Sequence, residues 1–388
     1  MLIKNHFFKN FYLKSKKFNK NLRKTKKAFQ YIEKNLLDFP ELRIHHEISR
    51  TELDFYPPQI KKFSKYKNIV VIGMGGSVLG TKSIYSYLKK KIKKNFFFFD
   101  NLDENLHIEF EKIKNLKNTG FIAVSKSGNT LETITNLNVI MSKINIKNKL
   151  AIITDRENTA SKDNILASLA EKNNIDIFIN HSQVGGRYSV LSETGMFPAA
   201  LMGLKIYQFK NLKKLIKNKV FVSSLILNVA SIFTLYKKNF KNSIILNYNS
   251  NLNDLGFWYQ QLTSESLGKN GNGINPVLST NPKDNHSLLQ LYLDGPKDKF
   301  FTFFDSITKN KKINSIIQAQ SKATKNVFIK EKIPFRQFFF NKLNEEEMGM
   351  FFTFTVLETI LLSRLIKINP FDQPAVEQVK IETQKILS

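Results

Sequence analysis

Cysteine is absent from the 388-residue sequence. Without it the chain can form no disulfide, no zinc site with thiolate ligands and no cysteine nucleophile. Long apolar runs are missing too: no stretch reaches the roughly 18 residues that a transmembrane helix needs, and the phenylalanines at 96–99 predict only a buried strand. We therefore expect a protein that is held together by packing and has no membrane partner.

Acidic residues are few beside basic ones. Asp and Glu total 32, Lys and Arg total 60, and the net charge is +28. Such a charge can indicate nucleic-acid binding, but lysine is spread along the whole chain beside many Asn, Ile and Phe residues, a mixture typical of AT-rich coding sequence. We expect no nucleic-acid partner, although the positive field would attract an anionic substrate until salt screened it.

Length and composition predict a folded protein of more than one domain. At about 150 residues per domain, the chain has room for two or three. Hydrophobic residues make up 42% of the sequence and aromatic residues 12%, which is enough for an extensive core.

The first 32 residues contain no acidic side chain. Organelle transit peptides share this feature but favour Arg and Ser, which before Thr25 occur only as Arg23 and Ser15. Apolar residues suited to one face of a helix are present instead, namely Phe11, Leu13, Phe18, Leu22 and Phe29. We expect a basic N-terminal helix that packs on the body of a cytoplasmic protein.

From residue 68 onward, apolar strands alternate with small-residue loops and helical stretches, which is typical of a doubly wound α/β layer with parallel strands. Residues 196–241 are then predicted to be helical, and a second alternation of strands and helices follows. The predicted strands are 69–72, 96–99, 120–124, 150–154 and 175–180 in the first alternation, and 244–248, 300–304 and 335–340 in the second.

Two further helices are predicted near the C-terminus. Asn344, with Glu347 three residues later, has the spacing of a capping box and opens a helix that runs through Leu365. Pro374 suits the first position of a final helix. The fold class is therefore α/β, with two tandem doubly wound domains and mainly parallel sheets at 61–205 and 206–388, an N-terminal helical segment at 1–60, and C-terminal helices.

The first strand of the first domain runs into a glycine-rich loop, GMGGSVLG, at residues 73–80. Backbone N–H groups and a helix N-terminus at the end of a strand form an anion site. A dinucleotide site is an alternative, because Asp100 follows at about the distance expected of a ribose-binding acid; however, Val78 occupies the place of the third glycine. A merely tight turn is the other alternative.

The third strand ends in a run of hydroxyl groups, SKSGNT, at residues 125–130. Ser and Thr at a helix start are often simple N-caps. Three hydroxyls with Lys126 and Gly128 in six residues exceed what capping requires, so this loop predicts a phosphate cradle.

Six blocks of sequence together resemble the phosphoglucose isomerase family, most closely its shorter bacterial forms. They lie between Gly73 and Lys380 in the family's order and spacing, and read GMGGSVLG, SKSGNTLET, GGRYSVLSETG, QQLTSESLGK, DNHSLLQLYLDGP and NPFDQPAVEQVK. The resemblance implies two SIS-type domains and a glycolytic and gluconeogenic enzyme that interconverts glucose 6-phosphate and fructose 6-phosphate. It also implies that no cofactor and no metal is needed.

The resemblance makes Glu265 the base that moves a proton between C1 and C2 of the sugar. From the residues alone, Glu132 and Glu193 are equally eligible. Arg187 matches the family's cation that stabilises charge on the enediolate oxygens, a role that fits its Gly-Gly setting because glycine allows close approach. A buried ion-pair partner is the structural alternative for Arg187.

His286 and Lys380 correspond to the family's residues that open and close the sugar ring. Histidine suits proton transfer at neutral pH. Because the family contributes this histidine across the subunit interface, the resemblance implies a homodimer with composite sites.

Substrate-binding residues are implied in the same way. Phosphate would bind Gly76, Ser77, Ser125, Lys126, Ser127 and Thr130, and the sugar hydroxyls would bind Gln261 and Gln373. One position departs from the family, since Leu267 stands where many members have Asn, and this leaves the secondary specificity open. Gln261, four residues before the base, favours glucose over a dual glucose and mannose enzyme.

Two other classes stay open. SIS domains also serve as non-catalytic sugar-phosphate sensors, which would have little reason to keep Glu265, His286 and Lys380 together. The other alternative is a nicotinamide dehydrogenase, which the interrupted glycine spacing disfavours.

Overall fold

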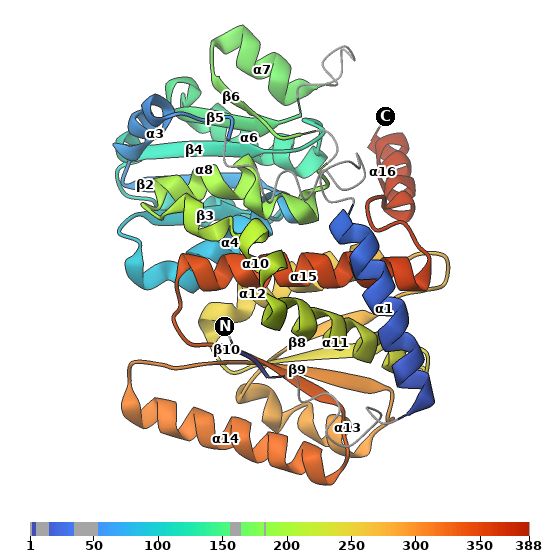
Figure 1. Ribbon diagram of the computed structural model, residues 1–388. Coiled ribbons are helices and arrows are strands. Elements are labelled where there is room, and N and C mark those ends of the chain that lie inside the picture. The colour runs from blue at the N-terminus through green and yellow to red at the C-terminus, as the bar shows by residue number, and fades with distance from the viewer. Residues whose placement is uncertain (1, 5–14, 35–52, 156–163, 182–183, 388) are drawn as a thin grey trace.

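The computed structural model of the protein describes residues 2–4, 15–34, 53–155, 164–181 and 184–387. Two five-stranded sheets lie one above the other in the view of Figure 1, with a layer of helices between them. Every strand of the two predicted alternations is present, which confirms the expected α/β class with mainly parallel sheets.

The first sheet is entirely parallel, in the order β3-β2-β4-β5-β6. Its central strands are buried along their whole length, as expected when helices cover both faces of a parallel sheet. The strands are β2 (Asn68–Gly73), β3 (Asn95–Phe99), β4 (Thr119–Val124), β5 (Leu150–Thr154) and β6 (Asp176–Ile179).

The second sheet has the order β1-β10-β9-β7-β8, with only β1 antiparallel. Its strands are β1 (Leu2–Lys4), β7 (Asn242–Asn247), β8 (Asn275–Thr280), β9 (Lys299–Ser306) and β10 (Phe335–Phe340). The sequence did not predict β1 or β8. Pro276 obscures β8, because proline cannot donate a ladder hydrogen bond and is confined to edge strands such as this one.

Both sheets share one winding order. The second strand in sequence lies outside the first, and the third lies on the other side, so the connections reverse between β2 and β4 in the first sheet and between β7 and β9 in the second. In doubly wound sheets, ligands bind beyond the carboxyl ends of the strands at such a reversal. The fold therefore predicts a ligand-binding site at the loops after β2 and β4.

The central helices bury side chains against both sheets, and a single apolar cluster contains Ile69 of β2, Leu255 of the middle layer and Phe338 of β10. The helices are α1 (Lys16–Lys34), α3 (Pro57–Ser64), α4 (Gly76–Leu88), α5 (Glu104–Glu111), α6 (Leu131–Lys143), α7 (Ile165–Asn173), α8 (Glu193–Leu201), α9 (Ile206–Phe209), α10 (Leu212–Lys217), α11 (Lys219–Tyr236), α12 (Asn253–Leu267), α13 (Leu289–Asp294), α14 (Lys311–Lys330), α15 (Glu345–Ile366) and α16 (Pro374–Leu387).

The predicted N-terminal helix is α1. It buries Phe18 and Phe29 against α11 and α15, and the Asn21 amide donates to Thr234 Oγ1 of α11 at 2.9 Å. Phe11 and Leu13 lie outside the described residues. The segment is not purely helical, because β1 pairs with β10. The division at residues 60 and 205 stays a prediction.

The capping signal before α15 is partly confirmed. Asn344 Oδ1 accepts the Glu347 N–H at 2.9 Å, as a cap should. The Glu347 carboxylate instead accepts the N–H groups of Asn341, Lys342 and Leu343. It therefore organises the turn before the helix and does not close a reciprocal box.

Among the residues that the structure describes, two helices are long and apolar enough to cross a membrane, α11 and α15. The sequence contains no uninterrupted apolar run of that length, but a mean hydropathy over 18 residues tolerates isolated polar residues, so these two helices pass the test. In this structure 67% of the α11 window and 78% of the α15 window are buried inside the protein. Both helices belong to the central layer.

A buried ion pair joins β10, α12 and α15. Arg336 donates to both carboxylate oxygens of Glu358, at 2.5 and 3.1 Å, and also to the Tyr259 hydroxyl at 2.6 Å. Both charged side chains are almost completely buried. Since Tyr259 lies on α12, this network helps to fix the helix that carries Gln261 and Glu265.

Candidate active site

The glycine-rich loop after β2 makes a close backbone contact with a second glycine loop. A Cβ atom on Gly76 would lie 2.2 Å from the carbonyl carbon of Gly186 and 2.4 Å from the Arg187 nitrogen, so only glycine fits. Gly75 has φ +50°, a conformation that glycine adopts easily. Its missing side chain leaves room for Gln261, whose amide nitrogen would be 3.0 Å from a Cβ.

The loop after β4 collects the three predicted hydroxyls. Ser125 Oγ lies 2.8 Å from Thr130 Oγ1 and accepts the Gly128 N–H at 3.1 Å, and Ser127 Oγ accepts the Asn129 N–H at 3.3 Å. Thr130 stands at the N-cap position of α6, but its side chain makes no capping hydrogen bond. Simple capping therefore does not account for this loop.

Lys126 carries the positive charge of the second loop. Burial lowers the pKa of its ammonium group, the Asp155 carboxylate opposes this shift, and the positive charge of Arg187 lowers the pKa further. The effect of Arg187 on this pKa means that the two cations lie within electrostatic reach of each other. This is a suitable place for a doubly charged anion.

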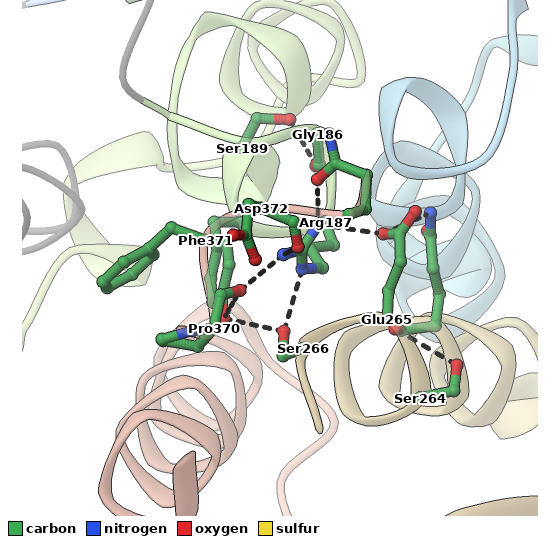
Figure 2. Close-up of polar contacts among 12 residues, drawn as sticks. Gly186, Arg187, Ser189, Ser264, Glu265, Ser266, Pro370, Phe371 and Asp372 are labelled. Carbon is green, nitrogen blue, oxygen red and sulfur yellow. Dashed lines mark hydrogen bonds and ion pairs between the residues drawn. The ribbon is translucent and has the colours of Figure 1, made fainter. Parts of the chain in front are cut away.

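Arg187 is the central residue of the site, and its side chain is buried. Its Nε donates to Ser266 Oγ at 2.8 Å, and its Nη1 donates to Glu265 Oε2 at 3.2 Å and Gln373 Oε1 at 2.9 Å. Its Nη2 donates to the backbone carbonyl oxygens of Pro370 and Asp372. Figure 2 shows these contacts converging from three separate parts of the chain.

Glu265 lies near the C-terminal end of α12, one turn after Gln261. Its Oε2 accepts from Gln261 Nε2 at 3.3 Å as well as from Arg187. The side chain is 26% exposed, so a substrate can reach the carboxylate. Neither Glu132, in the first turn of α6, nor Glu193, which is buried and accepts the Asp54 N–H, contacts this arginine in any described hydrogen bond.

Four neighbours were not predicted from the sequence. Ser266 and Tyr188 share a hydrogen bond of 2.7 Å beneath Arg187. Lys269 and Asp372 form an ion pair of 2.9 Å beside it. All four lie inside the motif blocks. They stand close in sequence to Arg187, Glu265 and Gln373, and this closeness was the one feature of the sequence that could have predicted them as site residues.

Leu267, the position that departs from the family pattern, does not face this cluster. It is 0% exposed and belongs to the apolar core between the sheets. A leucine there adds buried apolar area, and nothing in its surroundings links it to the chemistry of Glu265.

Residues 59–283, more than half of the chain, match the family model described as phosphoglucose isomerase. The chain belongs to the phosphoglucose isomerase family. It is 36% identical to the glucose-6-phosphate isomerase of Methanocaldococcus jannaschii over 82% of this chain and 84% of the relative. It is 29% identical to that of Campylobacter jejuni, over 83% and 86% of the two chains.

A solved structure shares the fold. The crystal structure of a glucose-6-phosphate isomerase from Chlamydia trachomatis matches with a TM-score of 0.77 at 17% identity, covering 95% of this chain and 85% of that one. At this identity the likeness establishes the architecture alone.

Two residues singled out by the likeness to phosphoglucose isomerases make no described contact with the Arg187 cluster. His286 is exposed on the short turn Lys283–His286, and Lys380 is 60% exposed on α16, where its Nζ lies 2.8 Å from Glu377 Oε1. Within the described ranges, no hydrogen bond or ion pair joins either residue to Arg187 or Glu265. The described contacts therefore bring together Glu265, Arg187, Gln261 and Gln373, but not the whole predicted set.

No cluster of three or more His, Asp or Glu side chains suited to a metal ion occurs in the part of the chain that the structure describes.

Proposed function

We propose that this protein is an aldose–ketose isomerase that interconverts glucose 6-phosphate and fructose 6-phosphate in the cytoplasm. The observation that carries the proposal is the contact between Arg187 and Glu265 beside two anion-binding loops. A solvent-accessible carboxylate and a buried cation meet in this contact, and Lys126 of the predicted phosphate loop lies within electrostatic reach of the cation. These are the three groups that an enediolate mechanism needs.

Glu265 would act as the base. Once the sugar ring is open, its carboxylate removes the proton from C2 of the aldose, and the electron pair moves to form an enediolate with the carbonyl oxygen at C1. The proton of the C2 hydroxyl passes to the C1 oxygen, the same carboxyl group returns the abstracted proton to C1, and the C2 carbonyl of the ketose forms. Arg187 would stabilise the negative charge that develops on the enediolate oxygens, and a buried cation is effective there because little water screens it.

The distal phosphate would be held by the two strand-end loops. Ser77 and Gly76 contribute the N-terminus of α4, and the second loop contributes Lys126 and three hydroxyls, Ser125, Ser127 and Thr130. Helix N-termini and cations both favour a phosphate dianion.

The sugar hydroxyls would meet two glutamines. Gln373 Oε1 already accepts from Arg187. Gln261 Oε1 is buried with no hydrogen-bond partner among the described residues, and an orphaned buried acceptor is costly. A substrate hydroxyl that donates to it would remove that cost, which supports a role in binding.

His286 and Lys380 would move the protons that open and close the ring, with His286 supplied by the second subunit of a homodimer. The exposure of His286 in a single chain supports this arrangement. Mixing Glu265→Gln and His286→Ala subunits tests it. Random pairing makes half of the dimers mixed, each with one intact composite site, so about a quarter of wild-type activity should return. Absence of recovery in a verified mixed dimer would contradict the shared site.

The reaction itself is tested by following glucose 6-phosphate formed from fructose 6-phosphate, on purified protein without added metal. We expect turnover, and a loss of at least about 100-fold with Glu265→Gln. A sugar-phosphate sensor would show ligand-dependent thermal stabilisation without turnover, and a dual enzyme would also convert mannose 6-phosphate. Stabilisation by NAD but not by sugar phosphate would overturn the proposal.

A further inference from the structure

Lys269 is unusual among the lysines of this chain because its side chain is only 9% exposed. It stands two residues beyond the end of α12 and reaches the segment between α15 and α16. Its Nζ donates to the Asn369 carbonyl oxygen and pairs with Asp372 Oδ1 at 2.9 Å. Burial lowers the pKa of this ammonium group, while the Asp372 carboxylate supports its charge.

The same segment, residues 369–373, is also held by Arg187. The guanidinium donates to the carbonyl oxygens of Pro370 and Asp372 and to the Gln373 side chain. Two cations from different parts of the chain, the buried Arg187 and the largely covered Lys269, therefore hold this five-residue segment. Arg187 holds the Gln373 side chain directly. Lys269 instead holds the backbone at Asn369 and the Asp372 side chain.

This segment leads directly into α16. The helix begins at Pro374, contains no buried residue, and stands beside the rest of the molecule in Figure 1. Within one chain its direction is consequently set by the residues that precede it. Lys380 lies six positions after Pro374, so a small rotation at residue 373 would move its ammonium group by a large distance.

We propose that the Lys269–Asp372 ion pair is a positioning device for α16, which fixes the start of the helix that carries Lys380. Lys269 is a positioning residue and takes no part in proton transfer. The inference rests on the proposed function, because it assigns Lys380 to the ring-opening step.

The first test compares Lys269→Met and Asp372→Asn with a matched control pair. Lys62→Met and Asp176→Asn remove an ion pair of 2.5 Å that joins α3 to β6, at the opposite end of the first sheet from the phosphate loops. We expect each site variant to lower kcat/KM by about 10- to 100-fold, since misplacement of a reacting group by about 1 Å can cost that much. The control variants should stay within about twofold of wild type, as expected of an exposed pair.

A double-mutant cycle identifies the route of the effect. If Lys269 acts through α16, Lys269→Met should lower activity strongly in the wild-type background and by less than about twofold in a Lys380→Ala background. An equal loss in both backgrounds would refute the proposal. An active wild type whose Lys269→Met variant is unimpaired would refute it as well, while leaving the isomerase activity intact.

Hydrogen exchange of residues 374–387 provides a readout independent of catalysis. Lys269→Met should accelerate exchange in the first turns of α16, whereas Lys62→Met should not. Unchanged exchange in α16 would contradict the positioning role, whether or not the protein isomerises glucose 6-phosphate.

Discussion

Replacing Arg187 by Met should damage catalysis and stability by separate amounts that the structure allows us to estimate. The methionine keeps an apolar stem of similar length and removes every guanidinium hydrogen bond. Removal of one group that stabilises a developing oxyanion typically costs 10²- to 10³-fold in kcat, so we expect a loss of at least about 100-fold. Arg187→Lys keeps the positive charge, but an ammonium group cannot donate to all the acceptors that surround the guanidinium. Its loss should therefore be smaller than that of Arg187→Met but still clear.

The effect on stability follows from the acceptors left behind. Ser266 Oγ and the Pro370 carbonyl oxygen bond to Arg187 in a buried setting. Both acceptors keep a hydrogen bond to the Tyr188 hydroxyl, so the loss is that of the Arg187 hydrogen bonds themselves. At about 0.5–1.5 kcal/mol for each of these two bonds, the free energy of unfolding should fall by about 1–3 kcal/mol. Arg364, which is exposed and lies over the Tyr31 ring, offers a control, and Arg364→Met should change neither quantity much.

The assay measures kcat and KM for fructose 6-phosphate at a temperature at which circular dichroism shows that each variant is folded. Urea unfolding of the same samples gives the free energy of unfolding. A folded Arg187→Met protein with kcat within tenfold of wild type would refute the role given to this side chain. An unchanged urea midpoint would refute its role as the centre of the hydrogen-bond cluster.

Three further predictions concern other parts of the structure. Burial lowers the pKa of Lys126 from its usual 10.5, so kcat/KM should fall as the pH rises through that lowered value, and Lys126→Arg should move the fall to higher pH. Gly76→Ala places a Cβ 2.2 Å from backbone and should abolish activity, whereas Gly185→Ala meets only ordinary contacts and should lose far less. Glu358→Gln leaves the Arg336 charge buried and unpaired, and urea unfolding should show a loss of about 3–5 kcal/mol.

The first domain was predictable from local sequence because its strands are short apolar runs bounded by small residues. Those runs are buried on both faces in the parallel sheet, so the pattern and the structure agree. The second domain was harder to predict. β8 contains a proline at a sheet edge, and β1 has three residues whose only signal is pairing with β10, which is distant in sequence.

The residues of the site could be predicted where they belong to a sequence motif, but the contacts between motifs could not. The Gly-Gly-Arg block and the helix that contains Glu265 are 78 residues apart in sequence, and only the fold reveals that Gly76 allows the first loop to pack against Gly186. The Lys269–Asp372 pair gave no local signal, since one lysine among so many resembles a solvated side chain until its burial is known. No hydrogen bond or ion pair among the described residues joins His286 or Lys380 to Arg187 or Glu265, and Lys380 pairs with Glu377.

The most direct test of the account is proton exchange at the sugar carbons. Wild-type protein incubated with fructose 6-phosphate in D2O should introduce deuterium at C1 of the ketose and C2 of the aldose, as followed by NMR. Glu265→Gln should lose at least about 100-fold of this incorporation, while fructose 6-phosphate still raises its melting temperature. A folded, ligand-binding Glu265→Gln protein that incorporates deuterium within tenfold of the wild-type rate would contradict the assignment of the base.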